Sequence, residues 1–428
     1  HYEFNLVRKA LKEREVLLRA APHIIWPMRF VLPVDEGMRP AWLLRLGLFL
    51  YDHLGGRDIL PGTRGVNLLK DHRGDPLQKR LKKGFAYSDC WVEDARLVSL
   101  TARDAANRGA DIRTRAECVE LDRGADHWNL QIRQHGEQKT EQARILVNAA
   151  GPWVDPVTAM YDSSSHAAKL RLVKGSHIVV KRKYEGDHSY IFQNKDGRII
   201  FAIPYEGDHT LIGTTDEPWS YAEGPAKIND GEIDYLCDAA SEYFEAPVTR
   251  DDIIWTYSGV RPLFDDHSRT AATVTRDFVF DYDNENGAPV LSIFGGKITT
   301  YRVLALQAIR TLSDALDVNG DDWTKEAPLP GGDFPPDGFD ALVDQYAIRW
   351  PFVEKSVVRR LVRAYGTDTA SILKDTKSIS DMGQPFGSGL YEIEIQWLID
   401  REFACTAEDV LWRRSKLGLH MSEVEKQA

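Results

Sequence analysis

The chain has 428 residues, with 54 Lys and Arg against 65 Asp and Glu and a formal net charge of -11. This acidic balance argues against a surface that serves as a nucleic-acid footprint, so no nucleic-acid partner is expected. The length allows two or three domains. The four cysteines lie far apart without CxxC spacing, and no metal site is predicted.

The first residues already follow a helical pattern. Apolar side chains recur at Phe4, Val7, Leu11 and Leu18, and neither an initiator Met nor a capping residue precedes them. We therefore expect a helix at the start of the chain and a missing segment before it. "IIWPMRFVLPV" follows as an extended apolar segment.

A strongly apolar stretch, "RPAWLLRLGLFLYDHLGG", spans residues 39–56 with only Arg45 in its middle. The favoured interpretation is a buried helix. The alternative is a surface helix that dips into a membrane interface. In that alternative the inserted side chains are Trp42, Leu43, Leu46, Phe49 and Leu50.

The middle of the chain shows two patterns. A helix in "WVEDARLVSLTARDAANRG" is followed by strand-like stretches ending in "ARILVNAAGPWV", which predicts an α/β layer with a parallel sheet. Residues 170–290 are rich in strand patterns, with turn signals at Asp196-Gly197 and at Glu206-Gly207-Asp208. They predict an antiparallel sheet inserted between two parts of the α/β layer.

The last part of the chain is predicted to be helical. A linker dense in Pro and Gly, "KEAPLPGGDFPPDG", spans residues 325–338. Helical patterns follow it, and Thr406 with Asp409 forms a start that resembles a capping box.

A strand-to-helix turn is the first candidate site. "APVLSIFGGKITTYRVLALQAIR" begins as a buried strand, breaks at Gly295 and Gly296, and continues as a helix. Free N–H groups at a helix start stabilise an anion or an electron-rich ring edge, and Lys297 adds a full charge. The turn is not a Walker loop, because an upstream glycine is absent and Ile298 replaces the hydroxyl residue. The alternative is an ordinary turn capped by Thr299.

Other candidates come from separate segments. "VNAAGPWV" ends a strand in small residues, which lets a ligand lie against the backbone. His177 stands on a strand, where a histidine is more often a packed core residue than a catalyst. Arg261 has apolar flanks and needs an anionic partner. Together with Arg276 and Lys297, it suits a phosphorylated substrate.

The motifs together carry a resemblance. "HYEF", "ALKEREVLLRAAPH", "YSDCWVEDARLV", "NAAGPWV", "KGSHIVV", "IGTTD", "WTYSGVRPL", "TRDF", "FGGKITTYR" and "DVLWRRSKLG" are similar to motifs of the FAD-dependent, respiratory-type glycerol-3-phosphate dehydrogenases. The resemblance spans nearly all of residues 1–418. It implies an α/β plus antiparallel β fold with a Rossmann-like FAD domain, here truncated at its N-terminus, an inserted antiparallel substrate domain and a C-terminal helical domain. The implied boundaries are 1–165 and 288–324 for the FAD domain, 166–287 for the substrate domain, 325–338 for the linker and 339–428 for the helical domain.

The resemblance implies oxidation of sn-glycerol 3-phosphate to dihydroxyacetone phosphate, with electrons passed from FAD to a membrane quinone. It places Arg261 and Lys297 at the substrate, His177 near the reacting end, and Arg276 as a further neighbour. His177 is the candidate base for the C2 hydroxyl proton, although Arg261 could instead polarise that oxygen. Lys297 and the helix start would stabilise negative charge on the reduced flavin. The residues implied to touch the flavin are Ala149, Ala150, Gly151, Trp153, Gly295, Gly296, Lys297, Ile298, Thr299 and Thr300.

Two other functions stay open: a glycerol-3-phosphate oxidase that passes electrons to O2, and a truncated scaffold without catalysis. The family's glycine fingerprint and an arginine–tyrosine pair are absent before "HYEF", so we expect the isolated chain to bind FAD weakly. The apolar stretch Trp42–Leu50 and the insoluble electron acceptor motivate the hypothesis of a cytoplasmic protein attached peripherally to a lipid surface, the inner face of the cell membrane. A homodimer is the assembly considered.

Overall fold

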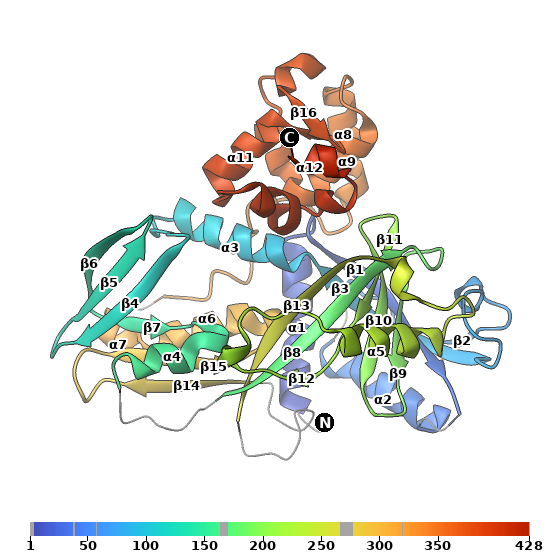
Figure 1. Cartoon of the computed structure of the whole chain (residues 1–428), viewed down its shortest axis with the longest axis horizontal. Coiled ribbons are helices and arrows are strands. Elements are labelled where there is room, and N and C mark those ends of the chain that lie inside the picture. Colours follow the sequence, from blue (N-terminus) through green and yellow to red (C-terminus); the bar gives the residue numbers. More distant parts are fainter. Residues whose placement is uncertain are drawn as a thin grey trace.

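The computed structural model describes residues 4–36, 39–56, 58–162, 170–265, 277–318 and 320–427. Figure 1 shows a large sheet beside a smaller sheet, with the C-terminal helices above both. The helix expected at the start of the chain is α1 (Phe4–Ala20), which packs between the two sheets.

The large sheet has nine strands, in the order β12-β8-β11-β10-β9-β1-β3-β2, with β13 paired to the other edge of β8. Nearly all pairs are antiparallel, as the sequence predicts for residues 170–290; β1 and β9 run parallel. The strands are β1 (Ile25–Val34), β2 (Arg64–Asn67), β3 (Lys83–Val92), β8 (Leu170–Lys181), β9 (Ser189–Gln193), β10 (Ile199–Tyr205), β11 (His209–Gly213), β12 (Glu217–Pro218) and β13 (Ile253–Phe264).

Helix α5 (Asp230–Ser241) covers one face of this sheet. It buries Leu236 and Ala240 against strand residues such as Ile178 and Ile212. Asn229 caps the helix, because its side chain accepts a hydrogen bond from the Glu232 N–H at 2.9 Å. The opposite face of β8 and β13 is thereby left for other contacts.

The domain to which residues 25–92 belong differs from the predicted domain boundaries. These residues supply β1, β2 and β3 to the large sheet, although the boundaries place them in the FAD domain. Strand β1 joins the large sheet through its parallel pairing with β9, in which Phe30 lies opposite Ser189. Because these residues are far apart in the chain, no local sequence pattern predicts that they pair. The other domain boundaries stay a prediction.

The smaller sheet has the order β14-β15-β7, with β7 parallel to β15. Its strands are β7 (Leu146–Asn148), β14 (Phe278–Asp283) and β15 (Val290–Gly295). The helices beside it are α4 (Val154–Ala159), α6 (Tyr301–Thr311) and α7 (Ser313–Leu316), and the short turns η2 (Gly151–Trp153) and η5 (Ile298–Thr300) follow strands β7 and β15.

The sequence analysis predicts a parallel sheet between the helix in "WVEDARLVSLTARDAANRG" and "NAAGPWV", and this prediction is wrong for most of that segment. Helix α3 (Asp94–Asn107) is followed by an antiparallel meander of β4 (Ala116–Arg123), β5 (Trp128–Gln134) and β6 (Glu137–Ala143), which forms a sheet of its own. Only β7 joins β15 in parallel. The tight turn between β5 and β6, with His135 and Gly136 at positive φ, favours an antiparallel hairpin.

The C-terminal helices form a separate hydrophobic cluster, as predicted. The predicted cap is also present, because Thr406 and Asp409 exchange hydrogen bonds between side chains and backbone N–H groups. The elements are α8 (Phe339–Arg349), α9 (Lys355–Tyr365), η6 (Gly366–Asp368), α10 (Thr369–Ile372), η7 (Ile379–Met382), β16 (Pro385–Gly387), β17 (Leu390–Tyr391), α11 (Glu392–Glu402), the π-helix η8 (Asp409–Arg414), η9 (Leu417–Leu419) and α12 (Glu423–Gln427). Further short turns among the described residues are η1 (His72–Gly74), η3 (Tyr221–Glu223) and η4 (Arg250–Asp252).

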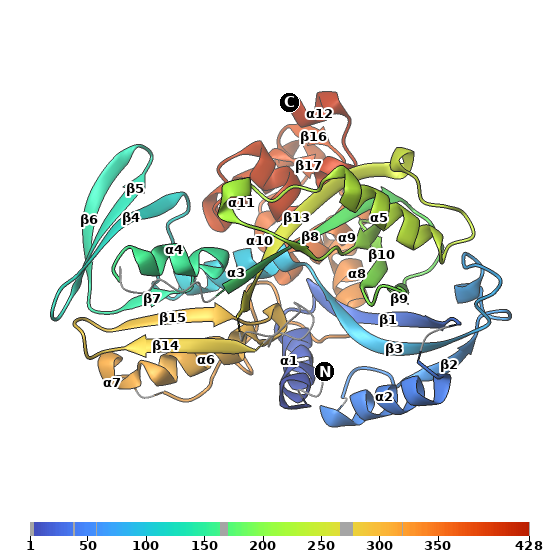
Figure 2. The same ribbon diagram turned by 60° about the horizontal axis from the view of Figure 1, so that its bottom comes forward.

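Helix α2 (Ala41–Leu54) is the stretch for which a buried helix was favoured, and that interpretation is wrong. None of its residues is buried, and Trp42 is 68% exposed. Its polar residues face the protein instead: Tyr51 accepts a hydrogen bond from Arg14 and donates one to Asp89. The apolar side chains are consequently exposed to solvent, and the helix itself lies at the edge of the molecule (Figure 2).

Within the described residues, no helix is both long and apolar enough to cross a membrane.

A buried ion pair ties α3 to the C-terminal helices. Arg96 donates to both carboxylate oxygens of Glu402, the Nη2–Oε1 distance being 2.9 Å, and both side chains are buried. We expect Glu402→Ala to lower the free energy of unfolding by about 3–5 kcal/mol, because it leaves the Arg96 charge buried without its partner. Denaturant unfolding of the Arg96→Met/Glu402→Leu double variant is the control, and it should recover most of the loss. A single variant as stable as the double one would contradict this role.

Candidate active site

His177 occupies the middle of β8, between two partner strands. Its direct partners are Gly213 on β11 and Tyr257 on β13. Directly paired residues point to the same face, so the His177 and Tyr257 rings meet. They stack with centroids 4.8 Å apart and an interplanar angle of 10°. The absence of a side chain at Gly213 makes room, since a Cβ there would overlap the imidazole.

The stack continues beyond Tyr257 into the C-terminal helices. Tyr257 contacts Trp255, two residues before it on the same face, at 5.2 Å between centroids. Trp255 in turn stacks on Trp412 of the π-helix η8 at 4.8 Å. Four rings therefore join His177 to the helical domain.

Arg261 lies on the same face of the sheet as His177, four residues after Tyr257 on β13. It lies inside strand β13. Its guanidinium binds the Asp216 carboxylate, and its Nη2 donates to Thr214 Oγ1 at 3.0 Å. The anionic partner expected for this arginine is thus Asp216, on the segment that follows β11.

Glycines form the floor between Arg261 and His177. Gly175 and Gly259 are paired across β8 and β13. A Cβ on Gly175 would overlap the Arg261 guanidinium, whereas the space over Gly259 is open. A small ligand can therefore lie directly on the backbone between the cation and the imidazole.

Burial, and then the nearby positive charge of Arg261, lower the pKa of His177 to about 4. The imidazole is neutral at pH 7 for this reason. Its Nδ1 is buried and has no hydrogen-bond partner in the described part of the chain. A buried polar atom without a partner is costly in a fold, and it is typical of a group that meets a ligand.

The Gly295 turn reaches the same end of β13. Gly295 and Gly296 have φ of 71° and 98°, in the region that favours glycine, and η5 and α6 follow them as predicted. A Cβ on Gly295 would stand 3.8 Å from the carbonyl oxygen of Pro262, the residue after Arg261. The turn η2 contacts both β13 and β15. The three predicted segments therefore meet.

Apolar side chains are open around this turn. Ile298 is 45% and Trp153 57% exposed, and Gly151 has a positive φ of 57°. The end of β7 is held by Asn148, whose side-chain N–H donates to Val154 O at 2.9 Å. Backbone without side chains next to exposed apolar groups fits a flat ring system. The alternative of a cap by Thr299 fails, because the helix start has no side-chain cap there.

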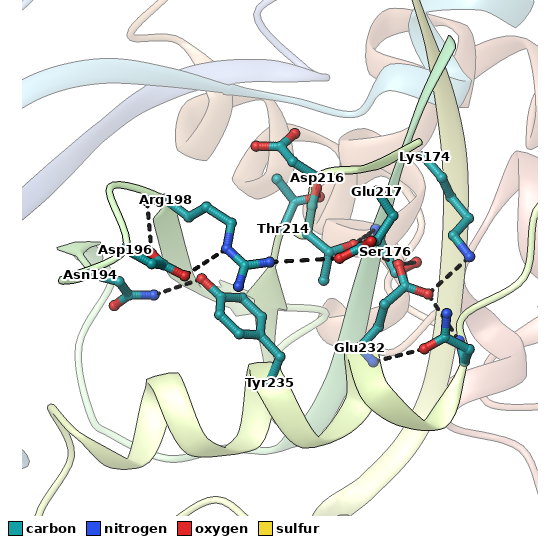
Figure 3. Close-up of polar contacts among 12 residues, drawn as sticks. Lys174, Ser176, Asn194, Asp196, Arg198, Thr214, Asp216, Glu217, Glu232 and Tyr235 are labelled. Carbon is teal, nitrogen blue, oxygen red and sulfur yellow. Dashed lines mark hydrogen bonds and ion pairs between the residues drawn. The ribbon is translucent and has the colours of Figure 1, made fainter. Parts of the chain in front are cut away.

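A polar cluster supports the site from the opposite face of the sheet (Figure 3). Glu232 of α5 accepts hydrogen bonds from Ser176 Oγ at 2.8 Å and Thr215 Oγ1 at 2.7 Å, and it pairs with Lys174 at 3.0 Å. Burial alone would raise the pKa of Glu232, but hydrogen bonds from Thr215 and its neighbours lower it overall. The cluster fixes the segment after β11, so that the Thr215 carbonyl can accept from Arg261 at 3.4 Å.

Some site residues escaped the sequence analysis. Tyr257, Gly213, Thr214 and Asp216 were not assigned roles, although "IGTTD" and "WTYSGVRPL" were noticed. The alternation of Trp255, Tyr257, Gly259 and Arg261 is the signal that places these side chains on one face. Arg276, expected near the substrate, lies outside the described residues.

Comparison with known proteins decides the family. Residues 1–302 match the FAD dependent oxidoreductase family model, and residues 323–428 match the C-terminal domain of alpha-glycerophosphate oxidase. The chain is 44% identical to the aerobic glycerol-3-phosphate dehydrogenase of Escherichia coli K12, over 99% of this chain and 84% of the relative. This chain belongs to the FAD-dependent glycerol-3-phosphate dehydrogenase family.

Two further matches refine the comparison. The chain is 47% identical to the D-erythritol 1-phosphate dehydrogenase of Brucella abortus, over 100% of this chain and 86% of that protein. Among solved structures, the FAD complex of the glycerol-3-phosphate dehydrogenase from Bacillus halodurans superposes with a TM-score of 0.78 at 25% identity, covering 98% of this chain and 83% of that one. The fold of the present chain is therefore that of this dehydrogenase family, and FAD is the family's cofactor.

The residues around the Gly295 turn fit FAD. The bare backbone of Gly295 and Gly296, the exposed Ile298, and the open turn at Gly151 provide a surface for the flavin ring. The cofactor-binding residues expected from the sequence lie in these two turns; their individual contacts with FAD stay a prediction.

The buried imidazole gives a pH prediction. The folded pKa of His177 lies near 4, below its ordinary value of 6.5, so neutral His177 contributes stability that is complete above pH 6.5 and is lost as pH falls toward 4. We expect NMR of histidine-labelled protein to show one ring, absent in His177→Asn, that titrates with a midpoint near 4. A midpoint at the ordinary value would show that the imidazole is not desolvated.

Proposed function

We propose that this chain oxidises sn-glycerol 3-phosphate to dihydroxyacetone phosphate. The observation that supports the proposal is the placement of Arg261 and His177 on one glycine-floored face, beside the turn that fits FAD. Glycerol-3-phosphate dehydrogenases are among the relatives that are 44% and 46% identical over 99% of this chain.

The side chains have complementary tasks in this reaction. Arg261 holds the anionic substrate, and neutral His177 accepts the proton of the C2 hydroxyl group. Because its pKa is low, His177 returns that proton readily to solvent. Lys297, at the start of the helix, binds at the junction of substrate and flavin. When bound, FAD supplies the two-electron acceptor.

D-Erythritol 1-phosphate is a second candidate substrate, because the relative of that name is 47% identical to this chain. The space over Gly259 is open, so no side chain there would clash with a longer polyol. Measuring kcat/KM for both phosphates decides between them, since a pocket that recognises one added CHOH unit discriminates by about 10–200-fold. A chain that oxidises neither phosphate would be the non-catalytic scaffold.

We propose a membrane quinone as the electron acceptor. The alternative acceptor is O2, as in a glycerol-3-phosphate oxidase. Release of hydrogen peroxide upon addition of substrate would support the oxidase, whereas reduction of a soluble quinone analogue without peroxide would support the dehydrogenase.

We propose that α2 rests on a lipid surface at the cytoplasmic side of the cell membrane. Polar contacts of Tyr51 and Asp52 hold the helix to the protein, through Arg14, Asp89 and the Thr63 N–H. The face left outward is apolar, with exposed fractions of 68% at Trp42 and 56% at Phe49. An interfacial helix buries such a face at the boundary of head groups and acyl chains.

We expect Arg261→Gln to lower kcat/KM by about 10²–10³-fold, because the substrate loses its charged partner. Lys297→Ala should lower turnover with folding retained. Steady-state kinetics with thermal unfolding on the same samples measures both. Arg133→Gln, an exposed arginine on β5 whose partner is Glu117, is the control and should act like the parent protein. Near-parent turnover in Arg261→Gln and Lys297→Ala would refute their assignment to the site.

The Leu46→Asp/Phe49→Asp variant tests the lipid contact. We expect it to lose sedimentation with vesicles, because charges on the outward face of α2 oppose insertion. Leu69→Asp is the matched control, since Leu69 is 57% exposed but lies off this helix. Unchanged sedimentation of the double variant would reject the lipid contact. A concentration-dependent mass in light scattering, abolished by the same substitutions, would instead assign the face to a homodimer.

A further inference from the structure

A cavity lies away from His177 and Arg261, between the C-terminal helices and the large sheet. Its volume is 590 Å³, which is within the range of small-molecule sites. One wall comes from α9 and the π-helix η8, and the other comes from β1, β3 and the end of β10. None of the site residues described above lines it. We call it the interdomain cleft.

The helical wall is strongly basic, but some of its charge is already neutralised. Arg96, Arg360 and Arg413 have carboxylate partners outside the cleft, namely Glu402, Glu394 and Asp409. Arg359 likewise pairs with Asp340. These four arginines line the wall, but their charges are already neutralised and are not the ones expected to bind an anion.

Three other cations in the cleft have only backbone carbonyls as hydrogen-bond partners among the described residues. Arg363 donates to His23 O at 3.1 Å, Arg414 to Glu402 O at 2.9 Å, and Lys416 to Trp412 O at 2.8 Å. Burial, and then the positive charge of Arg359, lower the pKa of Arg363 to about 10, although the Glu93 and Asp340 carboxylates oppose this, so desolvation of the guanidinium outweighs its nearby anions. Guanidinium groups in this state favour a phosphate, which accepts two parallel hydrogen bonds.

The sheet wall is aromatic. Trp91 lies 6.2 Å from Trp26 and 6.0 Å from Tyr205 between ring centroids, and all three line the cleft. The Arg363 guanidinium sits over the Trp26 ring at 4.3 Å and so joins the two walls. A ligand here meets cations on one side and aromatic side chains on the other.

We propose that the interdomain cleft binds an organic phosphate of about nucleotide size, with its phosphate on Arg363, Arg414 and Lys416 and its planar part against Trp26, Trp91 and Tyr205. Recognition by charge and ring stacking together requires both parts in one molecule. The proposal is independent of the substrate and of FAD, because no residue is shared with their site.

Carboxylates in the cleft make the binding depend on pH. Burial, and then the charge of Glu93, raise the pKa of Glu206 to about 7, while Lys416 and Arg360 oppose this rise. Asp187 also lines the cleft. An incoming phosphate favours the neutral form of Glu206, so binding is coupled to proton uptake at this carboxyl group.

Isothermal titration calorimetry of the purified chain with AMP, inorganic phosphate and adenosine tests the proposal. We expect AMP to bind at least about tenfold more tightly than either fragment. Lys416→Gln and, separately, Arg363→Gln should weaken AMP binding by about tenfold. Lys426→Gln is the matched control, because Lys426 also approaches the Trp412 ring, at 5.7 Å, but lies outside the cleft. Circular dichroism of each variant checks that the fold is retained.

The proposal is overturned if AMP does not bind, if it binds no better than inorganic phosphate, or if Lys416→Gln and Lys426→Gln bind it equally. In the last experiment, the titration with AMP is repeated in the presence of saturating glycerol 3-phosphate. AMP affinity that is unchanged by it supports a separate cleft site, whereas displacement of AMP would place the nucleotide at Arg261 and refute the assignment.

Discussion

The pairing of β8 with β13 is the constraint on which the rest of the site depends. Its register decides which side chains share a face, and it sets His177 against Tyr257 and Gly175 against Gly259. A slip of one residue would exchange the two faces and would send His177 toward α5. The pairing is fixed on the α5 face of the sheet, both by apolar packing of Ile178 and Val180 and by the Glu232 cluster.

The two faces of this sheet divide the work between stability and chemistry. Toward α5, every polar group that the cluster buries has a partner, as Glu232 shows with Ser176, Thr215 and Lys174. Toward the other face, glycines replace side chains and the imidazole Nδ1 has no partner among the described residues. Polar networks in which every group has a hydrogen-bond partner make a fold rigid. A ligand that pairs with a neighbouring polar group without a partner gains the most binding free energy there.

Much of this arrangement could be predicted from the sequence. The strand, turn and helix around Gly295, the helical C-terminal part and the Thr406 cap all follow from local patterns. The membership of β1 to β3 in the large sheet does not, because it depends on pairing between distant segments. The prediction that helix α2 is buried was wrong for another reason. Its apolar content was read correctly, but hydropathy does not reveal that Tyr51 and Asp52 anchor the helix from its polar side.

The ring stack from Trp412 to His177 gives the helical domain a mechanical part in the site. The imidazole plane is set by Tyr257, whose own plane is backed by Trp255 and, across the domain boundary, by Trp412. A rotation of the helical domain that parted the two indoles would free Tyr257 to tilt and the imidazole to follow. The helical domain therefore helps to set the orientation of the His177 ring, on which the proposed proton transfer depends.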